Sequence, residues 1–281
     1  MICVLRELYG IDGATVTPIE HGRTNASFVV HANGASYVLR RAWAGKPEAQ
    51  IADEEHVLAH LVPPCDVPRI VPTLAGATHA IASGRVHHLF VAARGDVGPR
   101  YLGRDDHERV RNAMSRLAQL HRALAAVPCG PGEPWLGGRV ARIRTGPPGV
   151  DQVLARIRRL LPASESTQWL HGDYHLGNLL WTGNEVSAIV DFDDVARGSA
   201  ALEAGMALFA LSRQPAGEEG FVFDEGLWQA GRAAYAGSVE GDALVFCAYQ
   251  VLIHLEAAQR GLWDLTDGIG FWPCWHSLSR S

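Results

Sequence analysis

The chain has 281 residues, of which 47% are hydrophobic and 20% are charged, a balance typical of folded globular proteins and not of disordered ones. The net charge of −5 disfavours a nucleic-acid binder, and the longest apolar stretch, residues 243–255, is too short to span a membrane. The five cysteines form no Cys-x-x-Cys pair, so we expect reduced thiols in the cytoplasm. We expect no nucleic-acid or membrane partner, and a monomer or weak dimer.

Charge is distributed unevenly along the chain. Residues 1–170 hold 20 basic and 15 acidic side chains, whereas residues 171–281 hold 5 basic and 15 acidic ones. A strongly acidic second part can attract a cation, although acidic surfaces also simply keep proteins soluble. Lys46 is the single lysine among the basic residues, and all the others are arginines.

The N-terminal part reads mainly as strands. Short β-type runs at 27–30 and 37–40 flank Asn33-Gly34, which is a strong hairpin signal. Apolar residues at helical spacing predict one helix over 53–61, and a further strand is expected over 86–92.

After Gly95 the pattern becomes helical. Apolar residues on one face predict a long helix over 107–126, and the Gly- and Pro-rich segment 128–149 is expected to be a connecting loop. The remaining expected elements are a helix over 153–161, strands over 178–181 and 186–190, and helices over 200–212, 226–236 and 243–260. This order predicts an α+β protein with an antiparallel β-sheet N-lobe, 1–95, and a mainly helical C-lobe, 96–281.

The most informative segment is His-Gly-Asp-Tyr-His-Leu-Gly-Asn, from His171 to Asn178. Its spacing, H-x-D-x-x-x-x-N, is that of a kinase catalytic loop. Phosphoryl transfer needs a carboxylate beside the attacking hydroxyl, and Asp173 fits this role. His171 is expected to brace the loop. A structural loop rich in Asp and Asn is the alternative interpretation.

A second motif, Asp191-Phe192-Asp193, follows a short predicted hairpin. Phosphoryl transfer also needs Mg²⁺ to neutralise the triphosphate. Asp191 and Asn178 offer the hard oxygen ligands that Mg²⁺ prefers, so we expect them to hold the metal. Asp193 is expected either to support the metal or to face the substrate.

Together these motifs resemble the aminoglycoside phosphotransferase and choline kinase superfamily, whose members are relatives of the protein kinases. Gly172 stands where that family has glycine and protein kinases have arginine, and Leu117-Ala118-Gln119-Leu120-His121 resembles the family's "LxxLH" helix. The resemblance implies a bilobal protein-kinase-like fold, ATP or alternatively GTP as donor, Mg²⁺ as cofactor and a hydroxyl group as acceptor.

The resemblance also implies a nucleotide site in the N-lobe. Arg40 stands where the family often has a phosphate-binding lysine, and Glu54 stands where its helix supplies the partner of that base. An arginine can clamp phosphate oxygens and pair with an acid. A degenerate covering loop and a hinge for adenine supply the other expected cofactor contacts: Gly22, Asn25, Ser27 and Ala93.

The acceptor is expected to bind in the helical lobe, as it does in the family. The acidic excess after residue 170 favours a cationic acceptor, such as an aminoglycoside or a basic cyclic peptide of the capreomycin or viomycin type, whose phosphorylation confers antibiotic resistance. Asp193, Asp224 and Glu225 are candidate partners of its cations, and Glu203 is expected to buttress the catalytic loop. The alternatives are a small-metabolite kinase for choline, an amino acid or a sugar, and a nucleotide-binding pseudokinase, which the intact Asp173 and Asp191 disfavour.

Overall fold

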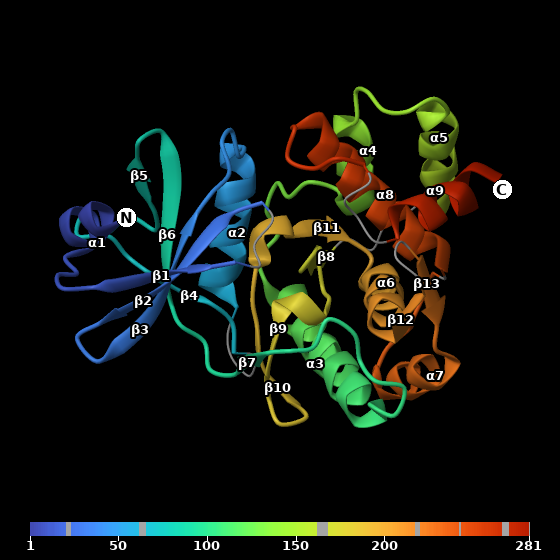
Figure 1. Cartoon of the computed structure of the whole chain (residues 1–281), viewed down its shortest axis with the longest axis horizontal. Helices are drawn as coiled ribbons and strands as arrows, with labels where there is room; N and C mark the ends of the chain where they lie inside the picture. Colours follow the sequence, from blue (N-terminus) through green and yellow to red (C-terminus); the bar gives the residue numbers. More distant parts are fainter. Residues whose placement is uncertain are drawn as a thin grey trace.

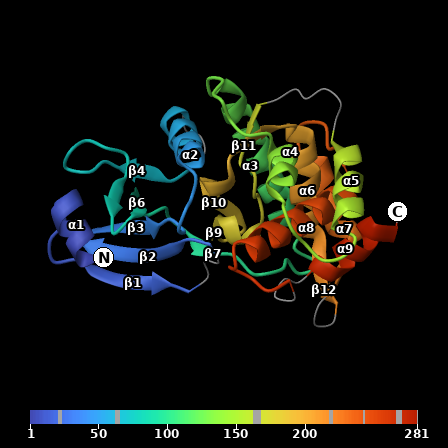
Figure 2. The same ribbon diagram turned by 90° about the horizontal axis from the view of Figure 1, so that it is seen from above.

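The computed structural model describes residues 1–20, 24–61, 66–161, 168–216, 220–241, 243–265 and 270–280. A β-rich N-terminal part lies beside a mainly helical C-terminal part (Figures 1 and 2), so the predicted α+β architecture is confirmed. Among the helices of these ranges, none is both long and apolar enough to cross a membrane.

The N-terminal part is built on an antiparallel sheet with the strand order β1-β2-β3-β6-β4, in which β5 also pairs with β6. The strands are β1 (Thr15–Ile19), β2 (Ala26–Ala32), β3 (Ala35–Arg41), β4 (Arg69–Val71), β5 (Ala80–Ala82) and β6 (Arg85–Val91). The predicted hairpin joins β2 to β3, because Asn33 and Gly34 have φ values of 51° and 75°, which a tight two-residue turn requires.

Within the described residues of this part, two helices accompany the sheet, α1 (Ile2–Tyr9) and α2 (Glu48–His60). The expectation of a single helix is therefore wrong. Helix α1 buries Leu5 and Tyr9 with Leu39 and Leu89 of the sheet, so tertiary packing stabilises a helix of only eight residues that would be marginal alone. Helix α2 begins five residues earlier than predicted.

The C-terminal part contains the helices α3 (His107–Ala126), α4 (Trp135–Arg142), α5 (Val150–Leu160), α6 (Ala200–Ser212), α7 (Glu225–Ala234), α8 (Ala243–Gln259) and α9 (Phe271–Arg280). Small β elements lie between them. Strand β7 (Asp96–Val97) joins the hairpin of β9 (Leu179–Thr182) and β10 (Glu185–Ile189), β8 (Gln168–Leu170) pairs with β11 (Ala196–Gly198), and β12 (Arg213–Ala216) pairs with β13 (Gly220–Phe223).

The helix predicted over 107–126 is α3 without any shift, but the loop predicted over 128–149 is wrong because it contains α4. The two glycines of α4 lower its helix propensity, while Trp135, Leu136 and Val140 are buried against the neighbouring helices. The β12–β13 hairpin lies between the helices predicted over 200–212 and 226–236, where no element was predicted.

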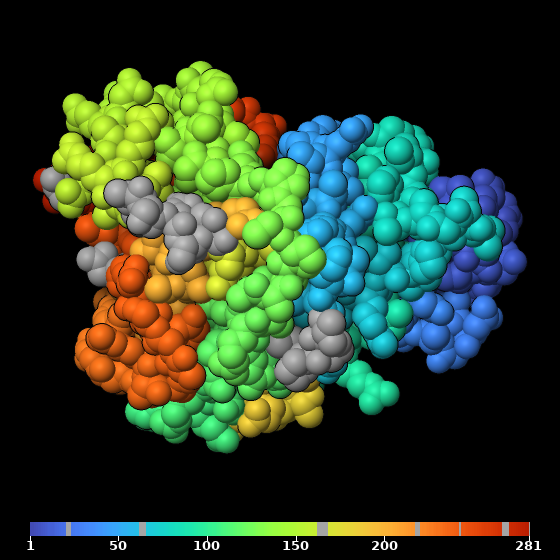
Figure 3. All heavy atoms as spheres, turned by 180° about the vertical axis from the view of Figure 1, so that it is seen from behind, coloured from blue at the N-terminus to red at the C-terminus, as the bar shows by residue number. Residues whose placement is uncertain are grey.

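Contacts between the two parts position the site. Seen from behind, the surface runs without a break from α2 to the chain that follows α3 (Figure 3), where His56 of α2 bonds the carbonyl of Pro128 at 3.0 Å. On α6, Leu208 packs with α3 and α7, whereas Phe209 packs with α8. Helix α6 therefore lies between two hydrophobic cores and contributes side chains to both. Its N-terminal turn faces the loop after β8.

Candidate active site

The loop between β8 and β9 carries the predicted general base, and Glu203 of α6 fixes the backbone of this loop. Gly172 has φ 86°, and a Cβ there would lie 1.8 Å from the backbone oxygen of Asp194, so this position requires glycine. The buried carboxylate of Glu203 accepts hydrogen bonds from Gly172 N at 2.5 Å and His171 N at 3.3 Å. The imidazole of His121 bonds the same carboxylate at 2.7 Å, so Glu203 joins the loop to α3.

His171 is a positioning residue in this geometry. Its ring is fully buried, with Nε2 3.0 Å from the carbonyl of Val190, and its Nδ1 accepts the backbone N–H of Asp173 at 3.3 Å. Nε2 therefore carries the proton and donates it to Val190. Burial lowers the pKa of His171, which keeps the ring neutral and in this orientation.

Both carboxylate oxygens of Asp173 accept hydrogen bonds. Tyr249 of α8 donates its hydroxyl to Oδ1 at 2.9 Å, while His175 Nε2 and Asn178 Nδ2 lie 3.2 and 3.3 Å from Oδ2. Burial alone would raise the pKa of Asp173, but His175 and Tyr249 hold that pKa well below its usual range. Asp173 is therefore ionised and oriented before any acceptor binds.

Asn178 and Asp191 present the oxygen ligands expected for a metal. Asn178 donates its side-chain N–H to the backbone oxygen of Asp173 at 2.8 Å, and within the described ranges no hydrogen bond uses its Oδ1. Asp191 has φ 64°, and its side chain is 44% exposed. Partial burial of Asp191 and the nearby Asp193 carboxylate raise the pKa of Asp191 to about 7, and a cation bound at this carboxylate would lower that pKa again.

Five charged side chains between β3, α2 and the segment after β10 form what we call the ion cluster: Arg40, Lys46, Glu54, Asp191 and Asp193. Arg40 Nη2 lies 2.5 Å from both carboxylate oxygens of Glu54, and its Nη1 lies 3.4 Å from Asp191 Oδ1. Lys46 donates to Asp193, and its Nζ lies 3.2 Å from Glu54. The predicted phosphate-binding arginine thus stands beside the predicted metal ligand.

The contacts of Asp193 come from the ion cluster and from α2. Its carboxylate contacts Lys46 and lies 3.7 Å from Arg40, and its backbone oxygen accepts a hydrogen bond from Gln50 at 2.7 Å. These contacts of Asp193 are all with the N-terminal part of the chain and not with the helices where the acceptor was expected.

The other residues predicted to contact the nucleotide lie in or next to the N-terminal sheet, which also carries Arg40. Ser27 of β2 is the strand partner of Arg40, Asn25 accepts the backbone N–H of Trp43 at 3.3 Å, and Ala93 follows the end of β6. Gly22 lies outside the described residues.

Asp224 and Glu225, the predicted acceptor residues, lie at the start of α7. Asp224 accepts the backbone N–H of Leu227 as the N-cap, and the exposed Glu225 bonds Gln229 one turn along. Neither side chain has a hydrogen bond to the catalytic loop among the described residues. Their first role is to begin a helix.

The sequence split at residue 170 exaggerates the acidity of the helical part. Arginines of α4 pack into that part, where Arg139 lies 2.6 Å from Asp194 and Arg142 lies 2.7 Å from Glu256. Residues 96–281 together hold 17 basic and 22 acidic side chains. The net charge of this part is therefore −5, half of the excess that suggested a cationic acceptor.

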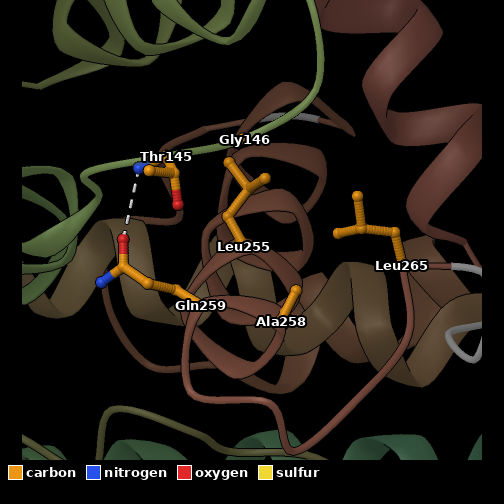
Figure 4. Close-up of a pocket in the computed structure, with 6 residues that line it drawn as sticks. All are labelled: Thr145, Gly146, Leu255, Ala258, Gln259 and Leu265. Carbon is orange, nitrogen blue, oxygen red and sulfur yellow. Dashed lines mark hydrogen bonds between the residues drawn. The ribbon is translucent and has the colours of Figure 1, made fainter.

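A cavity of about 270 Å³ lies in the helical part, near the C-terminal end of α8. It is lined by Thr145, Gly146, Leu255, Ala258, Gln259 and Leu265 (Figure 4), and the N–H of Thr145 donates to Gln259 at 3.4 Å. None of these residues belongs to the catalytic loop or the ion cluster, so the cavity is separate from the chemistry.

Tyr249, Lys46 and His175 were not predicted as site residues. Tyr249 lies 76 positions after Asp173 and matches no motif. Lys46 did carry a signal, because it is the one lysine of the sequence and directly precedes Pro47 at the start of α2.

Comparisons with known proteins concern the family and the overall fold. The profile of the phosphotransferase enzyme family matches residues 15–237, whereas no curated protein sequence matches the chain. A thermostable mutant of the aminoglycoside phosphotransferase APH(4)-Ia, in ternary complex with AMP-PNP and hygromycin B, superposes with a TM-score of 0.65 at 15% identity, covering 100% of this chain and 98% of that one.

Two further solved structures share the fold. The microcompartment-associated aminopropanol kinase has a TM-score of 0.63 at 18% identity, with 98% of this chain and 92% of that chain covered. The macrolide 2′-phosphotransferase MphH from Brachybacterium faecium has a TM-score of 0.57 at 18% identity, with 98% and 94% covered. The family match spans most of the chain, and the chain belongs to the phosphotransferase enzyme family.

Proposed function

We propose that the protein transfers the γ-phosphoryl group of ATP, with Mg²⁺, to a hydroxyl group of a small cationic acceptor, of the aminoglycoside or basic cyclic-peptide class. The observation that carries this proposal is the meeting of Asp173, Asn178, Asp191 and Arg40 in one place. ATP is favoured over GTP because the structural neighbour APH(4)-Ia was solved with AMP-PNP.

Asp173 performs the proton step in this proposal. Its ionised carboxylate already accepts a hydroxyl hydrogen bond, from Tyr249 at 2.9 Å. An acceptor hydroxyl at the other lone pairs of this carboxylate is oriented for in-line attack and loses its proton to Asp173. The donors on Asp173 keep it ionised near neutral pH, which this role requires.

The donor phosphates are held from the opposite side. Asn178 and Asp191 are the residues that would hold Mg²⁺, which supplies neutralisation of the triphosphate charge when bound. Arg40 is fixed by Glu54 so that Nη1 faces the same position. A guanidinium held in this way binds phosphate oxygens without losing further side-chain freedom.

A cationic acceptor is supported by the carboxylates that remain partly exposed around Asp173. The side chains of Asp173 and Asp194 are 22% and 29% exposed, and one arginine, Arg139, lies beside Asp194. An amine-bearing molecule fits this excess of negative charge. The second candidate acceptor is a small amino alcohol, such as the substrate of the structurally similar aminopropanol kinase. An amino alcohol also carries a cationic amine and a hydroxyl group, but in a smaller molecule.

The test is a screen for acceptor-dependent ADP release from MgATP. The panel contains aminoglycosides, capreomycin, viomycin, macrolides, choline and short amino alcohols, and MgGTP replaces MgATP in a parallel series. We expect stimulation by at least one multiply cationic antibiotic, and loss of that stimulation by about 10²–10⁴-fold in Asp173→Asn. Stimulation by small amino alcohols alone would favour the metabolic kinase, and no stimulation by any acceptor would contradict the proposal.

A further inference from the structure

Three potential metal ligands meet between α2 and the N-terminal sheet, next to the ion cluster. Glu55 of α2 lies with its Oε1 2.8 Å from Nδ1 of His79 and 2.8 Å from Nε2 of His88. His88 belongs to β6, and His79 directly precedes β5. All three ligand atoms lie within 4.8 Å of one another.

We propose that Glu55, His79 and His88 form a binding site for Zn²⁺. Two imidazole nitrogens and one carboxylate oxygen supply three ligands, and a water molecule completes the tetrahedral coordination that Zn²⁺ adopts. Imidazole ligands suit Zn²⁺, whereas Mg²⁺ and Ca²⁺ select oxygen. The site is therefore chemically distinct from the oxygen ligands of Asn178 and Asp191.

The surroundings of the three side chains favour a defined site. The ring of His88 stacks on Phe90 with a centroid distance of 5.6 Å, and His79 and His88 both already contact the same oxygen of Glu55. Such contacts orient metal ligands. His88 is 1% exposed and His79 is 29% exposed, so an ion can enter from the side of His79.

The proton balance of binding is simple. Each neutral imidazole that now donates an N–H to Glu55 moves its proton to its other ring nitrogen and offers the freed lone pair to the ion. Both rings remain neutral, and Glu55 remains an ionised ligand, so the hydrogen bonds of the metal-free cluster are replaced by bonds to Zn²⁺.

The position of this site links it to the nucleotide-binding machinery. Glu55 follows Glu54, which bonds Arg40, and His88 is the strand partner of Arg40 in the β3–β6 pair. An ion bound between α2 and β6 ties the helix to the sheet beside the Arg40–Glu54 pair. We therefore expect Zn²⁺ to stabilise the whole chain against thermal unfolding.

The test measures Zn²⁺ binding to the full chain after treatment with a chelator, by calorimetry in buffer that contains excess Mg²⁺. Wild-type protein is expected to bind one equivalent, with a rise of the unfolding temperature. His79→Gln should bind at least about tenfold more weakly, since loss of an outer contact alone weakens metal sites by 10–100-fold. His60→Gln is the matched control, because His60 is an exposed histidine on α2, and its binding should equal that of the wild type.

Two results would overturn the site. One is no saturable Zn²⁺ uptake by the wild-type chain, and the other is equal uptake by His79→Gln and the wild type. Because His79 is partly exposed, this variant is expected to fold, and its circular dichroism spectrum without metal verifies this. Co²⁺ substitution provides a second readout: wild type and His60→Gln should show the visible absorption of tetrahedral Co²⁺, and His79→Gln should not.

Discussion

Replacement of Lys46 by methionine tests whether the ion cluster holds the two parts of the chain together. Lys46 is 2% exposed, and its ammonium lies between Glu54 of α2 and Asp193 of the helical part. Methionine fills a similar volume and removes the charge. The variant leaves Arg40 as the one cation beside three carboxylates, of which Glu54 is 1% exposed.

The magnitude follows from the loss of one partner in a buried ion pair. Such losses cost about 3–5 kcal/mol, because the remaining charge stays buried without compensation. With a urea dependence of about 3 kcal/mol per molar, this lowers the unfolding midpoint by about 1–1.7 M. Since the carboxylates hold the pKa of Lys46 above its usual value although burial alone would lower it, the stabilisation is present below the lysine's unfolded pKa. It is lost as the pH rises through the higher pKa of the folded state.

Urea unfolding followed by circular dichroism at neutral pH and at strongly alkaline pH is the assay. We expect a large difference between wild type and Lys46→Met at neutral pH and a smaller one at alkaline pH. Lys46→Arg preserves the charge and should recover part of the loss. A Lys46→Met midpoint equal to that of wild type at neutral pH would refute the reasoning.

Two further predictions concern the site itself. Tyr249→Phe removes the hydroxyl donor of Asp173, and because a hydrogen bond to a charged group is worth about 1.5–3 kcal/mol, we expect kcat to fall by about tenfold while KM for ATP is unchanged. The pKa of Asp173 rises, so the acid limb of the kcat profile moves to higher pH; an unmoved limb with normal kcat would contradict the role of Tyr249. Asp191→Ala should abolish Mg²⁺-dependent ATP binding in a calorimetric titration, because the amide of Asn178 is a weak ligand alone. Unchanged MgATP affinity would exclude Asp191 as the metal ligand.

Local patterns predicted much of the fold. Helix α3 was predicted to the residue because its apolar face repeats over five turns, and the β2–β3 hairpin because Asn33-Gly34 favours one turn. Helix α4 and the β12–β13 hairpin were missed, since their stability depends on partners far along the chain. Trp135, for example, packs against Tyr249 with a ring distance of 5.6 Å.

The same distinction applies to the candidate site. Asp173, Asn178 and Asp191 lie within one loop–hairpin–loop segment, so their spacing alone indicates their chemistry. Tyr249 and Lys46 reach the site from other elements, and no spacing rule connects them to Asp173 or Asp193. The charge argument is weaker than the sequence suggested for a related reason, because Arg139 of α4 precedes the acidic segment in sequence but pairs with Asp194 and Glu256 in space.

The single lysine offers a direct view of motion between the two parts of the chain. Apart from the N-terminal amine, Lys46 is the one primary amine in the sequence, and it is closed off between α2 and the segment after β10. An amine-reactive reagent can reach its Nζ after the two parts of the chain move apart, so the rate of modification at this one position reports how often that separation occurs. A nucleotide that draws the two parts together should slow that rate, and mass spectrometry of the peptide that contains Lys46, after digestion, can follow it without any engineered label.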